Sequence, residues 1–118
     1  MKLISGLYKN KKNIFLARDI AGAKTSSWMD SVVARLGKNV YITIDVDGFD
    51  PSIMPSTGTP EPGGLQWYPV LQLLRMVAEK RNIIGFDLVE LSPQKSNHAP
   101  DFLCAKLIYK LIGYIFDK

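Results

Sequence analysis

The sequence predicts an α/β fold in which helices cover a parallel β-sheet. Short β-branched apolar runs recur along the chain, amphipathic stretches of helical period separate them, and no internal repeat or low-complexity linker interrupts the alternation. The implied order β, α, β, α, β, α is typical of strands joined by right-handed helical crossovers. In sheets of this kind, ligand sites gather at the carboxyl ends of the strands.

The first half of the chain is predicted to contain a short strand, a helix and an interior strand. The apolar run Ile14–Ala17 is expected to form the short strand. A helix is expected to begin at Ser27, which has capping-box spacing to an acidic residue three positions later, and to end at Gly37. The nearly continuous β-branched run Val40–Ile44 predicts an interior strand of a parallel sheet, and it leads directly into Asp45.

The second half is predicted to contain a helix, a strand and a final helix. Apolar residues recur at helical spacing over Trp67–Ala78, with Pro69 in the first turn and basic residues at the end, as proline preference and the helix dipole favour. The run Ile83–Leu91 is expected to form a strand that a proline stops. Asp101 is expected to cap the last helix, whose broad apolar face extends to Ile115.

Composition indicates one globular unit over residues 1–118, with 47% hydrophobic residues and a formal charge of +4. Nucleic-acid binding is not expected, because the basic residues are scattered and their one tight cluster lies at residues 9–12. Cys104 is the single cysteine and is expected to be a small buried residue. The N-terminal segment has too few apolar residues to form the core of a signal peptide. The apolar residues 102–116 are too few to span a bilayer, so a cytoplasmic location is predicted.

Two aspartates follow the interior strand. Because side chains alternate along a strand, Asp45 and Asp47 are expected to present both carboxylates on one side, where a divalent cation would offset their repulsion. Hard oxygen ligands suit Mg²⁺ or Mn²⁺. Two alternatives stay open on spacing alone. One is a turn in which Asp47 and Asp50 merely terminate the strand, and the other is an aspartate-nucleophile phosphatase, whose motif expects threonine where Phe49 stands.

Three segments carry a resemblance to a known family: VYITIDVDGFDP at residues 40–51, PSTGTPEPGGL at residues 55–65 and GFDLVELSP at residues 85–93. Together they resemble the signature of the ureohydrolase (arginase/agmatinase) family, and the PEPGG form looks closer to the agmatinase branch. The resemblance implies that residues 1–118 form the C-terminal part of a ureohydrolase domain. The implied fold is a partial three-layer αβα structure with a parallel sheet.

The resemblance also implies a reaction and its residues. Asp45 matches the aspartate that bridges two Mn²⁺ ions, and Asp47 matches a ligand of the second ion. In the family, the ion pair activates a water that attacks the guanidinium carbon of a small substrate such as agmatine and yields urea and an amine. Glu90 matches the carboxylate that binds the guanidinium by two-pronged hydrogen bonding, although a solvated strand end is the alternative for this residue.

The loop that follows Asp50 is rich in proline and glycine and is expected to shape the rim of the site. Gly58, Gly63 and Gly64 are assigned to backbone geometry, and Asp50 is assigned to hydrogen bonding within the loop. Asp87 is expected to be structural, because it lies on the strand face opposite the matching glutamate.

The sequence departs from the family in its metal ligands. A bridged ion pair needs about six protein ligands, and only Asp45 and Asp47 are found, since no histidine precedes Asp45. His98 is the single histidine and is expected to be exposed. The chain is therefore predicted to be a truncated, incomplete agmatinase-like enzyme that forms homo-oligomers or associates with a missing N-terminal portion. The alternative is a noncatalytic remnant or companion subunit, which would use its apolar last helix to join another polypeptide.

Overall fold

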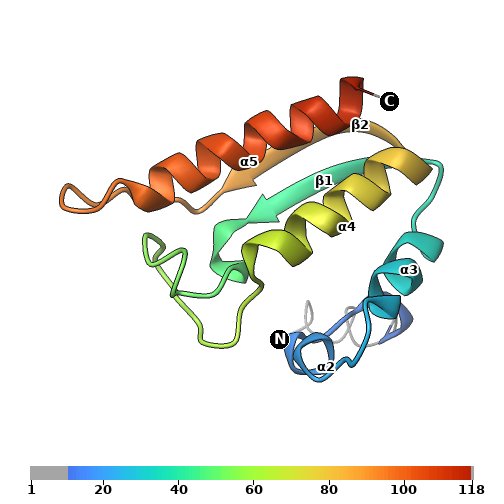
Figure 1. The fold of residues 1–118 in the computed structure, drawn as a ribbon, viewed down its shortest axis with the longest axis horizontal. Coiled ribbons are helices and arrows are strands. Elements are labelled where there is room, and N and C mark those ends of the chain that lie inside the picture. The colour runs from blue at the N-terminus through green and yellow to red at the C-terminus, as the bar shows by residue number, and fades with distance from the viewer. Residues whose placement is uncertain (1–10, 118) are drawn as a thin grey trace, which may run out of the picture.

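The computed structural model describes residues 11–117. The N-terminal stretch predicted to be too short for a signal peptide and part of the basic cluster at residues 9–12 therefore lie outside the described residues. A two-stranded parallel sheet and its helices make up the fold (Figure 1). The elements are, in order, η1 Lys11–Asn13, α2 Ala17–Ala21, α3 Ser27–Ala34, β1 Asn39–Asp45, η2 Val46–Gly48, α4 Trp67–Lys80, β2 Asn82–Val89 and α5 Ala99–Phe116.

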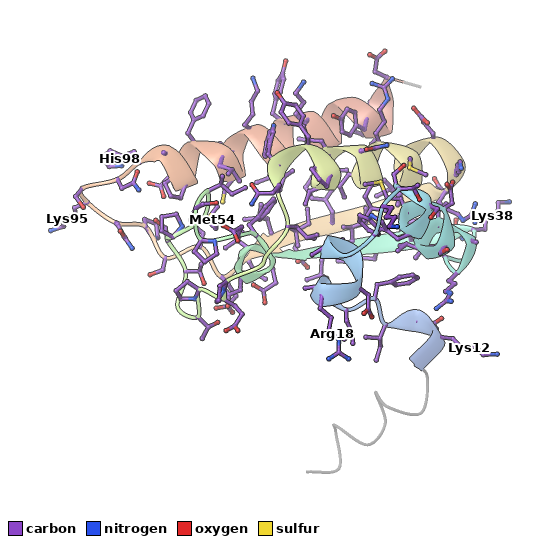
Figure 2. All side chains as sticks on the ribbon, turned by 60° about the horizontal axis from the view of Figure 1, so that its bottom comes forward. Lys12, Arg18, Lys38, Met54, Lys95 and His98 are labelled. Atoms are coloured by element: carbon purple, nitrogen blue, oxygen red, sulfur yellow. The ribbon has the colours of Figure 1, made fainter. Side chains whose placement is uncertain are left out.

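Strands β1 and β2 run parallel, with a register from Asn39 opposite Asn82 to Asp45 opposite Val89. The register shifts by one residue after Val40, where β2 carries an extra residue. Helix α4 makes the crossover between the strands, and α4 and α5 lie together on one side of the sheet (Figure 2). The α/β class with a parallel sheet is thus confirmed, although residues 11–117 contain two strands where three were expected.

The hydrophobic core lies between this side of the sheet and the helices. Helix α4 forms as its apolar spacing predicts, and the core joins residues of α3, α4, β2 and α5, among them Val33, Leu74, Val77, Ala78, Ile83, Cys104, Leu107 and Leu111. Val40, Ile42 and Ile44 of β1 pack against this cluster. The prediction that Cys104 is buried is confirmed. Among residues 11–117, no helix has the length and apolar character needed to cross a membrane.

The opposite face of the sheet remains largely open in the described part of the chain. Tyr41 and Ile84 are 57% and 65% exposed. The Tyr41 ring lies over Gly85, where an added Cβ would come within 2.8 Å of the ring, and its hydroxyl donates a hydrogen bond to Asp87 at 3.1 Å. This hydrogen bond raises the pKa of Tyr41. The predicted structural role of Asp87 agrees with this contact.

The strand predicted at Ile14–Ala17 is wrong. The Leu16 carbonyl accepts hydrogen bonds from the backbone N–H groups of Asp19 and Ile20, at 2.9 and 3.1 Å, so the chain turns into α2. The ring of Phe15 packs beneath the Arg35 guanidinium, at 4.9 Å from its centroid. A run of four apolar residues does not distinguish a strand from a turn that packs one side chain on a neighbouring helix.

Both predicted helix caps are also wrong. Helix α3 begins at Ser27, as expected, but its N-cap is Ser26, and the Ser27 N–H donates to Thr25 Oγ1 at 3.4 Å. The helix ends at Ala34, before the expected end at Gly37. Helix α5 has His98 at its N-cap, and Asp101 lies in the first turn. There the carboxylate of Asp101 complements the helix dipole and lies 3.5 Å from His98 Nδ1.

Candidate functional site

Three acidic residues gather where the two strands end. Asp45 is the last residue of β1, Asp47 lies in the short helix η2 that follows, and Glu90 comes directly after β2. Asp45 is paired in register with Val89, so Asp45 and Glu90 lie at the same edge of the sheet. The arrowheads of both strands point to this edge (Figure 1). This is the edge at which parallel sheets place their ligands.

The link between Asp45 and Asp47 differs from the one predicted. Strand alternation does not apply, because the strand ends at Asp45 and Asp47 lies in a 3-10 turn. Instead, Asp45 Oδ1 accepts a hydrogen bond from the Asp47 N–H at 3.0 Å and caps η2. Asp47 thus lies in a turn that follows the strand, as in the turn alternative left open by the spacing. Neither carboxylate is paired with an arginine within residues 11–117.

The carboxylate of Asp47 is held by two threonines. Thr57 Oγ1 donates to Asp47 Oδ1, and Thr59 Oγ1 donates to Asp47 Oδ2. The sequence analysis assigned no role to either threonine, although both lie in the proline- and glycine-rich run at residues 55–65. The available signal was a pair of hydroxyl residues, two apart, in a loop stiffened by prolines beside an acidic turn.

Asp50 closes the base of the same loop, as predicted. Its carboxylate accepts hydrogen bonds from the Ser52 hydroxyl, from the Ser52 N–H at 3.0 Å and from the Gly63 N–H at 3.2 Å. The Ser52 hydroxyl is the main cause that lowers the pKa of Asp50, and the backbone N–H groups add to it. The Leu65 N–H donates to the Gly48 carbonyl at 2.8 Å and completes the closure.

Two of the three loop glycines have the predicted geometric role. Gly63 has φ of +80°, and a Cβ at Gly64 would lie 2.4 Å from the Asp50 nitrogen and from the Phe49 carbonyl carbon. Gly58 has open space within 4 Å of its Cβ position, so the assignment of Gly58 to backbone geometry is wrong. Phe49 is itself buried, at 3% exposure, and belongs to the core.

The segment after β2 joins the same loop. The Ser92 N–H donates to the carbonyl of Ser56 at 2.9 Å, and Ser56 is fully buried. Glu90, two residues earlier, has φ of +69°, the only non-glycine residue of the described chain with a positive φ. This backbone conformation is uncommon for glutamate and ends the strand one residue before it. The predicted strand through Leu91 is therefore shorter than expected.

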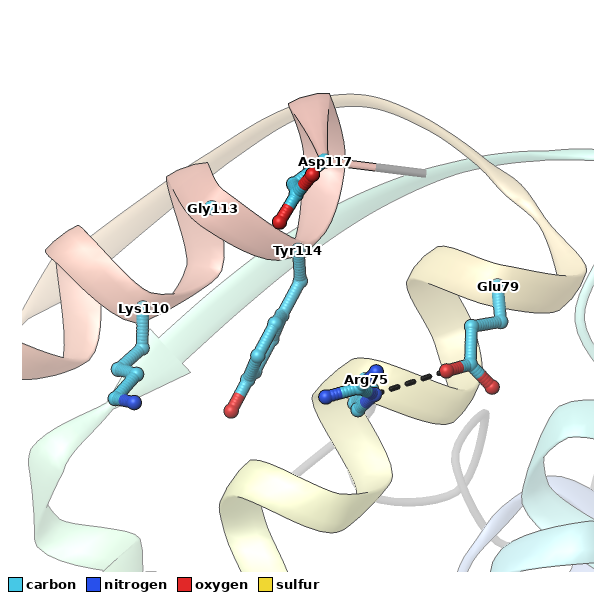
Figure 3. Close-up of a pocket in the computed structure, with 6 residues that line it drawn as sticks. All are labelled: Arg75, Glu79, Lys110, Gly113, Tyr114 and Asp117. Carbon is cyan, nitrogen blue, oxygen red and sulfur yellow. Dashed lines mark hydrogen bonds and ion pairs between the residues drawn. The ribbon is translucent and has the colours of Figure 1, made fainter.

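Other polar features lie apart from the acidic edge. The side chain of His98 is 79% exposed, as predicted, beside the start of α5, while Lys95 lies at the tip of the preceding loop (Figure 2). A groove of about 450 Å³ lies between α4 and α5, where Arg75 donates to Glu79 at 2.9 Å beside Tyr114 (Figure 3). Since α4 ends just before β2 begins, this groove lies at the end of the sheet opposite Asp45.

The acidic edge fits a metal ion in the kind of its ligands and falls short in their number. Carboxylate oxygens are suitable ligands for Mg²⁺ and Mn²⁺. Within residues 11–117, however, no group of three or more His, Cys, Asp or Glu side chains is placed to hold a metal ion. Asp45 and Asp47 therefore suit a partial site that further ligands would complete.

Comparison with known proteins places the chain in a family. The sequence model of the Arginase family matches residues 5–113. The chain is 45% identical over 107 residues to the N(1)-aminopropylagmatine ureohydrolase of Synechocystis sp., covering 88% of this chain and 34% of that protein. It is 39% identical over 82 residues to the agmatinase of Pyrococcus horikoshii, covering 70% of this chain and 29% of that protein.

A solved structure gives the same result. The fold matches the agmatine ureohydrolase of Thermoplasma volcanium with a TM-score of 0.72 and 35% identity, over 84% of this chain and 33% of that chain. The chain thus spans about a third of the length of the relatives it matches. The resemblance predicted from the loop and strand motifs is confirmed, and the chain belongs to the Arginase family.

Proposed function

We propose that this chain forms part of a metal-dependent site that hydrolyses a guanidino group to urea and an amine. One observation supports the proposal: Asp45, Asp47 and Glu90 all follow or end the two strands at the carboxyl edge of a parallel sheet, within segments that resemble the family signature. The names of the relatives, agmatinase and N(1)-aminopropylagmatine ureohydrolase, support agmatine or a related guanidino compound as the substrate.

Each acidic residue has a distinct role in this proposal. Asp45 and Asp47 would hold Mn²⁺ through their carboxylates. When bound, the metal would supply charge stabilisation and lower the pKa of a water. Glu90 would bind the substrate guanidinium, because a carboxylate and a planar guanidinium form paired, charge-assisted hydrogen bonds. The positive φ of Glu90 supports this assignment, since strained backbone conformations cluster at ligand sites.

The remaining ligands are proposed to come from other polypeptide. The chain spans about a third of its relatives, and we propose that residues 1–118 correspond to the C-terminal part of a ureohydrolase domain. The open face of the sheet, with Tyr41 and Ile84 exposed, supports association with a further polypeptide or a second copy. The cytoplasmic location and the lack of a nucleic-acid partner stay predictions.

Metal binding tests the ligand assignment. We expect the chain to bind Mn²⁺, measured from the electron paramagnetic resonance signal of free Mn²⁺, and both Asp45→Asn and Asp47→Asn to weaken binding by about tenfold or more. Asp19→Asn is the matched control, because Asp19 is an exposed aspartate of α2 whose nearest charged partner is Arg18 at 3.8 Å. Equal Mn²⁺ affinity in all four proteins would contradict the assignment.

Substrate binding tests Glu90. In a chimera in which this chain replaces the aligned third of the Synechocystis relative, we expect urea release from agmatine or N(1)-aminopropylagmatine. Glu90→Gln should lower kcat/KM by about tenfold or more, since it removes a charge-assisted hydrogen bond. Unchanged kcat/KM in the Glu90→Gln chimera would exclude Glu90 from substrate binding.

The noncatalytic companion is the second candidate, and the absence of a three-ligand cluster within residues 11–117 favours it. It predicts self-association or binding to another polypeptide through the exposed side of α5, where Phe102 and Tyr109 are 70% and 72% exposed. Sedimentation of the purified chain tests it, and a clean monomer that also fails to bind a ureohydrolase-like partner would argue against it.

A further inference from the structure

We infer that Thr57 and Thr59 are positioning residues that hold the Asp47 carboxylate in the orientation required for metal binding. The inference rests on the proposed function, because it assumes that Asp47 is a metal ligand. The two threonines lie in the loop after η2, and each donates its hydroxyl to a different carboxylate oxygen of Asp47.

A backbone hydrogen bond to the Thr57 oxygen leaves the proton of this hydroxyl available to Asp47. The Thr59 N–H donates to Thr57 Oγ1 at 3.2 Å, so an acceptor position of that hydroxyl is occupied. A threonine hydroxyl has one proton, and in Thr57 this proton is directed to Asp47 Oδ1. Thr59 then donates to Asp47 Oδ2 from the other end of the same short segment. The two contacts together fix the plane of the carboxylate, which otherwise rotates broadly about its terminal torsion.

The arrangement leaves Asp47 able to bind a cation. A carboxylate has about four lone-pair positions, and two hydroxyls occupy about half of them. Hydroxyl groups are also neutral, so they orient Asp47 without cancelling its charge, as a lysine or arginine partner would. Hydrogen-bonded partners of this kind orient metal ligands and contribute to metal affinity.

Asp50, in the same segment, shows the contrast. Its carboxylate accepts three hydrogen bonds, two of them from backbone N–H groups, and these link both ends of the loop. Asp47 contacts only side-chain hydroxyls through its carboxylate in the described chain. Asp50 therefore stabilises the loop, and the loop in turn places Thr57 and Thr59 beside Asp47.

The two threonines are placed by a loop that is fixed at separate points. The Leu65 N–H bonds to Gly48 at 2.8 Å, and the Ser56 carbonyl accepts from the Ser92 N–H at 2.9 Å. Ser56, which directly precedes Thr57, is fully buried. The hydroxyls thus approach Asp47 from a segment that is anchored on both sides, which is the condition for preorganising a ligand.

Mn²⁺ affinity tests the inference in the full chain. Thr57→Val and Thr59→Val remove a hydroxyl at nearly constant volume, and each should weaken Mn²⁺ binding by about tenfold to a hundredfold. Thr57→Ser and Thr59→Ser keep the hydroxyl and should restore most of the affinity. Thr25→Val is the matched control, because the Thr25 hydroxyl bonds to Ser27 ahead of α3, and it should leave affinity unchanged.

Asp47→Asn separates this inference from the proposed function. If the threonines act through Asp47, the Thr57→Val substitution should cause no further loss of affinity in the Asp47→Asn background. A loss with Asp47→Asn and none with either valine variant would overturn the inference and leave the proposed function intact. Unchanged affinity with Asp47→Asn would overturn the proposed function itself.

A metal-free measurement keeps the inference testable if the affinity of a two-ligand site is below detection. The ¹³C chemical shift of the Asp47 carboxyl carbon reports its hydrogen bonding. It should move in Thr57→Val and Thr59→Val, return towards the original value in the serine variants and stay constant in Thr25→Val. An Asp47 carboxyl shift that is the same in the original chain and in both valine variants would overturn the inference.

Discussion

The helical layer and the loop between η2 and α4 are stabilised by different interactions. Helices α4 and α5 contribute to an apolar core beside the sheet, with Leu74, Leu107 and Leu111 among the buried residues. The loop contributes the buried Met54 to the same core but is shaped by polar contacts of Asp47 and Asp50 and by the close backbone approach at Gly64. At the acidic edge, the Asp47 carboxylate is contacted by residues of this loop.

This difference indicates which substitutions each region tolerates. Apolar contacts are non-directional, so the layer should accept replacements that conserve volume. The loop depends on particular donor and acceptor atoms, so replacements of the same size should still disturb it. Stability of the chain therefore depends mostly on the helical layer, while the orientation of the proposed metal ligands depends on the loop.

The largest effect is expected from a cavity in the helical layer. Leu107→Ala should reduce the free energy of unfolding by about 2–5 kcal/mol, because Leu107 is fully buried in the core. Ile108→Ala, at the next position of α5, is the matched control, since Ile108 is 36% exposed and should cost less than half as much. Urea unfolding gives both values. Similar losses in the two variants would mean that α5 does not pack as described.

A smaller effect is expected from crowding the loop. Gly64→Ala should cost about 1–3 kcal/mol, since its Cβ would lie 2.4 Å from the backbone of Phe49 and Asp50. It should also weaken Mn²⁺ binding, because the displaced loop carries the contacts to Asp47. Gly58→Ala has open space around its Cβ and should change neither quantity appreciably. Equal effects of the two substitutions would contradict the described closure of the loop.

The smallest effect should be a pH-dependent contribution of Asp50. Its pKa is lowered from 3.8 in the fold, so the charged form stabilises the native state above that pH, and this contribution is lost as the pH falls through the folded pKa. Asp50→Asn should therefore be less stable than the original chain at pH 7, with a smaller loss of stability than Gly64→Ala causes. The difference in stability between Asp50→Asn and the original chain should narrow at pH 3. Denaturant midpoints at the two pH values measure it. A gap that does not change with pH would show that the charge of Asp50 does not contribute.

Sequence reasoning predicted well where one physical signal dominated. The β-branched run before Asp45 formed β1, and the apolar spacing from Trp67 formed α4, because the apolar side chains on one face of each element pack against the same core. It failed for Ile14–Ala17 and for the caps at Ser27 and Asp101. Those features depend on one or two hydrogen bonds, which neighbouring residues can supply equally well.

The sequence by itself determined the α/β class, the family and the positions of Asp45, Asp47 and Glu90, because a hydrophobic period and a long motif are properties of consecutive residues. Only the tertiary structure decided that Asp47 lies in a turn, that Thr57 and Thr59 hold its carboxylate, and that Gly64 requires the absence of a side chain while Gly58 does not. These facts depend on which atoms meet across a folded loop. The presence of a threonine or a glycine in the sequence does not show which distant atom that residue will contact.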